Sequence, residues 1–281
     1  MRSLLMLLLL TSMAATSQVN TYKISFSNAV HHEAKIEVTF PKIKSQELTV
    51  RMSRTSPGRY ALHEFAKNVY GFKAFNSEGK ELEITRENPY SWTVKNTDGT
   101  VNIEYILYAN RGDGTYSQVD ASHAHLNIPA TFMYSEELKD RDIELQIDLQ
   151  DQPDWKIATQ LEKINENTFK APDLYYFMDS PIEISDHQVK SFEHDGQKIE
   201  FVLHHQGTDA ELEQYFEQVK AIVEQEAAVF GELLDYDYGR YTFLACYMPN
   251  ASGDGMEHRN STILTKTDAL ADGGMKGNIG T

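Results

Sequence analysis

Apolar and polar residues alternate in short runs along the first part of the chain. The segments TYKISFSN (21–28), AKIEVTF (34–40) and VNIEYILY (101–108) alternate or stay apolar over the length of one strand. A period of two is typical of a strand with one buried face. Turn residues such as SPG (56–58) and TDG (97–99) separate these runs. Many short strands separated by turns predict an antiparallel β-sandwich.

The hydrophobic pattern changes near residue 180. The strand-like run KIEFVLHHQG (198–207) precedes a segment in which apolar residues recur at every third or fourth position. Thr208 and Glu211 have the spacing of a capping box, so the pattern predicts a helix over 209–234. The apolar stripe of this helix is expected to pack on a core. It consists of Leu212, Tyr215, Phe216, Val219, Ile222, Val223, Phe230, Leu233 and Leu234.

Two further strand-like runs follow this helix, at 240–248 and 261–268. The order of elements beyond residue 180 is therefore β-α-β. We expect a mostly β protein with some α, in which an antiparallel β-sandwich domain spans 18–180. A second structural unit is expected over 181–281.

The first 17 residues have the pattern of a secretory signal peptide. Arg2 provides a positive start, residues 4–10 form an apolar run, and small residues follow up to Ser17. The run is too short to span a membrane. We expect export to the periplasm or the extracellular space, without a membrane anchor. The alternative interpretation is a buried N-terminal helix.

Charge and cysteine content exclude some classes of protein. The formal net charge of −16 repels nucleic acid and anionic membranes, so no nucleic-acid partner is expected. Cys246 is the only cysteine, so stability must come from the core and not from an internal disulfide. It lies in the apolar run YTFLACYM (241–248), which indicates a buried small hydrophobe rather than a nucleophile.

Two histidine patterns are candidate metal sites. His63 begins a sequence similar to H-E-x-x-H, but Lys67 stands where the second histidine is required, and an ammonium group cannot ligate zinc. His123 and His125 would share one face of a strand, a geometry that metal sites use. The sequence shows no third ligand for them, so we favour a structural or solvent-exposed pair and leave their role open.

The remaining histidines do not complete a site either. The pairs His31–His32 and His204–His205 would point to opposite faces if they lie in strands, so neither pair is expected to chelate. His187 and His194 are isolated in predicted loops. From the residues alone, the chain contains no complete catalytic set and no metal-ligand set.

The segment YMPNASGDGMEHRNSTIL (247–264) raises a different possibility. Glycines in a strand let another backbone approach closely, so a peptide could pair with the strand edge. The carboxylate of Glu257 could then bind the free α-ammonium group of that peptide. The alternative is a hairpin turn with an exposed glutamate, which spacing alone favours.

This segment resembles the Gly-x-Glu-His strand motif of the glycyl aminopeptidase family of zinc metallopeptidases, which is peptidase family sixty-one and commonly contains a PDZ domain. Four other blocks resemble the family in the same order, so the resemblance spans about residues 21–281. These blocks are YKISFSNAVHHEAKIEVTF, SPGRYALHEFAKNVYGFKAF, VDASHAHLNIPATFMYSEEL and APDLYYFMDSPIEISDH.

The resemblance implies an N-terminal β-sandwich, then a thermolysin-like catalytic domain and usually a PDZ domain. It implies removal of N-terminal residues, such as Gly or Ala, from peptides. By similarity to other aminopeptidases, Glu257 would bind the substrate amino group, and Gly255 and Met256 would line the substrate strand. His258 matches the motif without an assigned role.

The zinc-binding H-E-x-x-H helix of the family is expected shortly after this strand, and the 281 residues do not contain it. We therefore expect an N-terminal fragment, truncated before that helix and inactive alone, with zinc bound only in the full-length protein. Its missing partner would be the C-terminal catalytic half. The alternative is a non-catalytic secreted β-sandwich module that binds peptides or glycans.

Overall fold

The computed structural model describes residues 18–270. The segment 1–17, where a signal peptide is expected, lies outside the described residues, as does 271–281. Among the described helices, none combines the length and the apolar character needed to cross a membrane.

A seven-stranded sheet forms the centre of the N-terminal part. Its strands in spatial order are β12 (Glu162–Asn165), β13 (Thr168–Ala171), β10 (Ile143–Asp148), β1 (Asn20–Asn28), β2 (Glu33–Phe40), β7 (Val101–Tyr108) and β4 (Val69–Phe75). All neighbours are antiparallel except β1 and β10, which run parallel. These two strands are far apart in the sequence, as a parallel pair requires a long connection.

Two smaller antiparallel sheets complete the sandwich. One contains β3 (Glu47–Arg51), β6 (Ser91–Lys95) and β5 (Ile84–Asn88), and the other contains β11 (Lys156–Thr159), β14 (Ile182–Ser185), β9 (His123–Leu126) and β8 (Gln118–Val119). Side chains from all three sheets form one continuous hydrophobic core. The mostly β fold with a sandwich at its N-terminal end confirms the prediction from the sequence.

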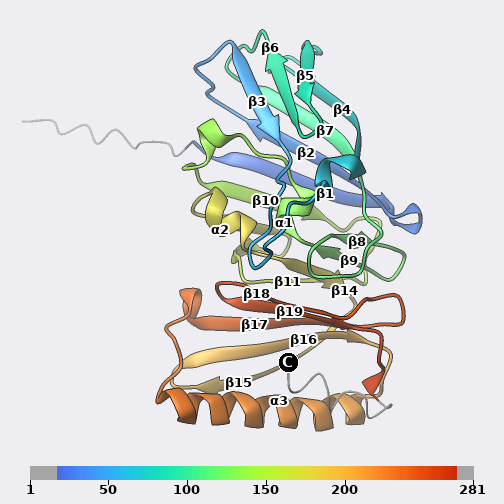
Figure 1. Cartoon of the computed structure of the whole chain (residues 1–281), viewed down its shortest axis with the longest axis vertical. Coiled ribbons are helices and arrows are strands. Elements are labelled where there is room, and N and C mark those ends of the chain that lie inside the picture. Colours follow the sequence, from blue (N-terminus) through green and yellow to red (C-terminus); the bar gives the residue numbers. More distant parts are fainter. Residues whose placement is uncertain (1–17, 271–281) are drawn as a thin grey trace, which may run out of the picture.

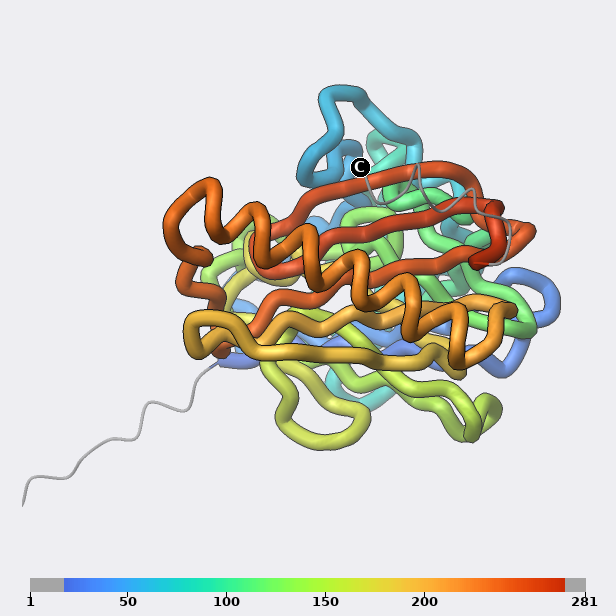
Figure 2. The backbone as a smooth tube through the Cα atoms, turned by 90° about the horizontal axis from the view of Figure 1, so that it is seen from below, coloured from blue at the N-terminus to red at the C-terminus, as the bar shows by residue number. Residues whose placement is uncertain are grey.

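A five-stranded sheet and one long helix follow. The sheet has the order β15 (Gln188–His194), β16 (Gln197–His205), β17 (Arg240–Tyr247), β19 (Ser261–Lys266) and β18 (Asp254–Glu257). Helix α3 (Asp209–Phe230) connects β16 to its parallel neighbour β17. One face of the sheet packs on α3 in a separate core. Figure 1 shows the other face toward the four-stranded sheet, and Figure 2 shows α3 crossing the outer face.

Short helices join the strands in the described part of the chain. They are α1 (Ile128–Thr131), α2 (Leu174–Met178) and the 3-10 turns η1 (Ala29–His31), η2 (Phe65–Asn68), η3 (Glu136–Leu138) and η4 (Asp237–Gly239). Helix α3 has the predicted capping box but ends four residues earlier than predicted. Gly231 follows it with φ of 91°, a left-handed conformation that terminates a helix.

Candidate functional site

Strand β18, which carries the Gly-x-Glu-His motif, lies at the edge of the five-stranded sheet. It pairs antiparallel with β19, so that Gly255 lies opposite Leu264 and Glu257 opposite Thr262. Within residues 18–270 no other strand pairs with it. An edge strand presents backbone donors and acceptors that an extended peptide can bind.

The side chains of β18 divide between the two faces of the sheet. Met256 is buried, whereas Glu257 is exposed and Gly255 is half-buried. Glu257 lies near Tyr241: burial raises the pKa of the Tyr241 hydroxyl, and the Glu257 carboxylate raises it further. The Tyr241 hydroxyl also contacts the Thr262 hydroxyl on the cross-strand partner of Glu257. Glu257 is therefore presented on the sheet as an exposed carboxylate near the side chains of Tyr241 and Thr262.

His258 lies just beyond β18, and its side chain is buried. Its Nδ1 is 2.7 Å from Oδ1 of Asp179 at the end of α2. The backbone N–H of Arg259 donates to the other oxygen of the same carboxylate at 3.2 Å. His258 therefore attaches the end of β18 to the sandwich, a positioning role that the sequence left open.

A loop of the sandwich contacts the beginning of β18. The Arg59 guanidinium forms an ion pair with the Asp254 carboxylate, to which the backbone N–H of Gly114 also donates at 3.0 Å. The backbone at Gly58 passes so close that a Cβ there would lie 3.3 Å from Cγ of Met256. The same loop exposes Tyr60 completely. Sequence reasoning missed these contacts, because it identified the loop only as part of a family block.

The histidines singled out in the sequence lie in different environments. His63 stacks on Phe65 with ring centroids 5.1 Å apart, next to a 3-10 turn of only four residues. The segment therefore does not form the helix that an H-E-x-x-H site requires. His123 and His125 are both buried on β9, and Nδ1 of His125 is 3.2 Å from a carboxylate oxygen of Glu183.

Potential metal ligands gather away from β18 in the described part of the chain. Among residues 18–270, the group of three potential ligands that lie close together is His123, His204 and Cys246, which contains no residue of β18. An exposed carboxylate on a sheet edge is suited to binding a cationic amino group. Strand β18 therefore presents an exposed carboxylate at a sheet edge, apart from this group of potential metal ligands.

The comparison with known families decides the identity of the chain. The family model described as the peptidase M61 N-terminal domain matches residues 21–186, which is more than half of the chain. The chain belongs to the peptidase M61 family. The resemblance on which this expectation rested is confirmed. A search of curated proteins finds no match.

Solved structures add a likeness of fold to the M61 family membership. An aminopeptidase N family protein from Idiomarina loihiensis superimposes with a TM-score of 0.77 and 23% identity, over 88% of this chain and 42% of that one. An M1 zinc metallopeptidase from Deinococcus radiodurans matches with a TM-score of 0.43 and 8% identity, over 89% and 60% of the two chains. The M61 chain thus spans less than half the length of the first of these proteins.

Proposed function

We propose that this chain is the N-terminal part of an exported zinc aminopeptidase of the M61 family, which removes N-terminal residues such as Gly or Ala from peptides. The observation that carries the proposal is the exposed Glu257 carboxylate on the unpaired edge of β18. Membership of the M61 family supports a peptidase role.

In this proposal, the substrate binds to β18 as an additional strand. Main-chain hydrogen bonds to the strand edge supply affinity regardless of sequence. Gly255 carries no side chain that would keep the peptide backbone away. The Glu257 carboxylate then pairs with the α-ammonium group, so that only a peptide with a free amino terminus is held at full strength. Met256 supports the strand from the buried side, and His258 holds its end through Asp179.

The catalytic zinc is proposed only for a longer protein. In zinc peptidases the metal activates a water molecule by lowering its pKa. Within residues 18–270, β18 contributes to no group of three close potential ligands, so we assign no step of hydrolysis to it. We propose that a C-terminal half supplies the zinc ligands, and that a PDZ domain is a further component. The partial coverage of the Idiomarina loihiensis structure is consistent with such a half.

Replacing Glu257 tests the role of its carboxylate. In the full-length protein, Glu257→Gln should lower kcat/KM for glycyl and alanyl substrates with a free amino group by about 10–100-fold, because a charge-assisted hydrogen bond contributes roughly 1.5–3 kcal/mol. Steady-state kinetics on free and N-acetylated peptides measure the effect. A chelator should abolish the activity.

The matched control is Glu232→Gln, which removes an exposed carboxylate just beyond α3. It should leave kcat/KM unchanged. Unchanged kinetics in the Glu257 variant would refute the assignment of Glu257. Binding of free amino termini without any hydrolysis by the full-length protein would instead support a non-catalytic peptide-binding module.

A further inference from the structure

A histidine–cysteine cluster lies between the sandwich and the five-stranded sheet. It consists of His123 on β9, His204 on β16 and Cys246 on β17. All three residues are buried, and one ligand atom from each lies within 4.8 Å of the other two. The cluster shares no residue with β18, so its function is separate from the peptide-binding role proposed above.

Strand alternation explains why these side chains converge. His204 and Cys246 are register partners on the parallel strands β16 and β17. Their neighbours Leu203 and Ala245 belong to the core under α3, so His204 and Cys246 face the opposite side, toward the sandwich. There the His123 ring lies 5.0 Å from the His204 ring, centroid to centroid.

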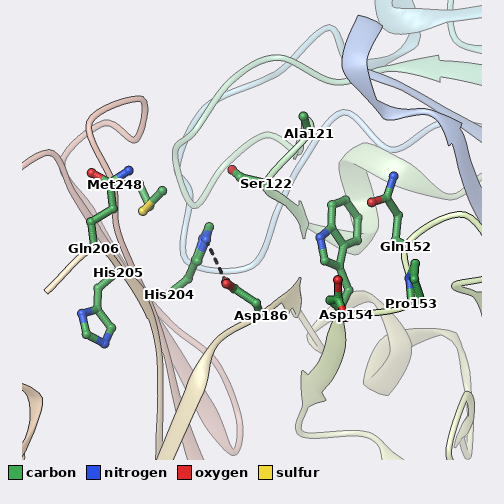
Figure 3. Close-up of a pocket in the computed structure, with 11 residues that line it drawn as sticks. Ala121, Ser122, Gln152, Pro153, Asp154, Asp186, His204, His205, Gln206 and Met248 are labelled. Carbon is green, nitrogen blue, oxygen red and sulfur yellow. Dashed lines mark ion pairs between the residues drawn. The ribbon is translucent and has the colours of Figure 1, made fainter. Parts of the chain in front are cut away.

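Each histidine has a carboxylate beside its second ring nitrogen. Nδ1 of His123 is 3.3 Å from Oδ1 of Asp120, and Nε2 of His204 is 3.5 Å from Oδ1 of Asp186. Figure 3 shows Asp186 facing the His204 ring. Metal-bound histidines almost always donate their other N–H to such a group, which orients the ring and raises its basicity.

The remaining donor atoms point to a ligand. Nε2 of His123 is buried and has no hydrogen-bond partner within the described part of the chain. Nδ1 of His204 is 3.7 Å from Sγ of Cys246. A buried nitrogen without a hydrogen-bond partner destabilises the fold, and coordination of an ion would offset that cost.

Negative charge surrounds the cluster. Glu183 is fully buried, and its Oε2 is 3.2 Å from Nδ1 of His125. Its Oε1 lies 3.8 Å from Nδ1 of His204 and has no hydrogen-bond partner among residues 18–270. Burial raises the pKa of the Cys246 thiol, and the Glu183 and Asp120 carboxylates raise it further. The same carboxylates favour a dication at this position, because opposite charges attract strongly where water is excluded.

We propose that His123, His204 and Cys246 bind a Zn²⁺ ion that joins the sandwich to the five-stranded sheet. Two imidazoles and a thiolate are a donor set that zinc prefers. Coordination releases the Cys246 thiol proton to solvent and forms the zinc–sulfur bond. Tetrahedral zinc places its ligand atoms about 3.3–3.8 Å apart. The His204–Cys246 distance of 3.7 Å already meets this requirement, and the His123 ligand atom lies within 4.8 Å of the other two.

A cavity gives the ion a path to the cluster. It has a volume of about 390 Å³ and is lined by His204 together with Ser122, Asp186 and Met248, among others. The Asp186 side chain at this cavity is largely exposed. Glu183 Oε1, 3.8 Å from Nδ1 of His204, is a candidate for a fourth donor.

Metal titration of the 281-residue chain tests the site. We expect one Zn²⁺ per chain after removal and restoration of metal, measured by elemental analysis and by competition with a chromophoric chelator. With Co²⁺ as the probe, a thiolate-to-cobalt charge-transfer band should appear and should be absent in Cys246→Ser. Asp186→Asn alters an exposed group and should weaken Zn²⁺ binding by about 10–100-fold.

His205→Gln is the matched control, because His205 is the neighbour of His204 on the other face of β16. This variant should bind Zn²⁺ as tightly as the wild type. A wild-type chain that binds no stoichiometric Zn²⁺ would overturn the proposal, and so would a cobalt band that persists in Cys246→Ser. Should Cys246→Ser fail to fold, an unchanged affinity in Asp186→Asn would count against the site. None of these measurements uses peptidase activity, so they are independent of the proposed function.

Discussion

At the scale of single residues, Gly58 is a point of close contact between the sandwich and β18. Its φ is 74°, a conformation that L side chains rarely adopt, and an added Cβ would meet Cγ of Met256 at 3.3 Å. Any side chain at this position must therefore strain the loop and also press on the buried face of β18. This contact explains locally how the loop and the strand hold each other in place.

Gly58→Ala should lower the free energy of unfolding by roughly 2–4 kcal/mol, from left-handed strain of about 1–2 kcal/mol and from overpacking. Gly79→Ala is the control, since Gly79 has a φ of 79° but no atom lies within 4 Å of the position that an added methyl group would take. Urea unfolding of both variants measures the difference. Equal losses would show that the contact with Met256 contributes nothing.

At the scale of elements, helix α3 is held at its start by a local motif. The Thr208 hydroxyl accepts from the backbone N–H of Glu211, and the Glu211 carboxylate accepts from the backbone N–H of Thr208 at 2.7 Å. The Thr208 backbone N–H and, at 2.9 Å, the Thr208 hydroxyl both donate to the Glu211 carboxylate and lower its pKa. Because both partners lie within four residues, the motif could be predicted from the sequence.

Thr208→Ala should cost about 1 kcal/mol of stability, because an orphan N–H at the start of α3 loses its acceptor. Glu211→Ala should also destabilise the chain, and the double variant should lose less than the sum of the two single variants, because the two side chains form one motif. Chemical denaturation of the three variants measures this coupling. Strictly additive losses would contradict a reciprocal capping box.

The end of α3 shows the limit of reasoning from pattern. The apolar stripe continues past the helix, so the sequence predicted an end at residue 234. The structure ends the helix at Phe230, and Phe230 and Leu234 are both exposed. Gly231 was the available signal, because glycine favours the left-handed conformation that stops a helix. The prediction followed the apolar periodicity, which continues to Leu234, instead of this glycine.

At the scale of the whole molecule, Gln160 connects the sandwich to the five-stranded sheet. Its buried amide donates from Nε2 to the carbonyl of Asp179 at 2.7 Å and to Oγ of Ser180 at 3.0 Å. Its Oε1 accepts from the backbone N–H of Asn260 at 3.0 Å and from Oγ of Ser261 at 2.7 Å. One side chain thus satisfies groups from both the sandwich and the five-stranded sheet.

Gln160→Leu should destabilise the chain by roughly 2–4 kcal/mol, because several buried polar groups lose their partners at about 1–3 kcal/mol each before relaxation. It should also speed amide hydrogen exchange in β18 and β19 relative to the sandwich strands. Gln218→Leu, at an exposed position on α3, is the control and should have little effect. Exchange that stays uniform would refute a linking role for Gln160.

The local patterns of the sequence determined the short strands, the start of α3 and the identity of the Gly-x-Glu-His strand. Periodicity and capping depend on residues within one or two turns of each other, so they can be read without a fold. The partners of His258, Gln160 and His123 were decided only by the tertiary structure. They come from segments about 80 to 120 residues away in the chain, and the packing of one sheet on another brings them together.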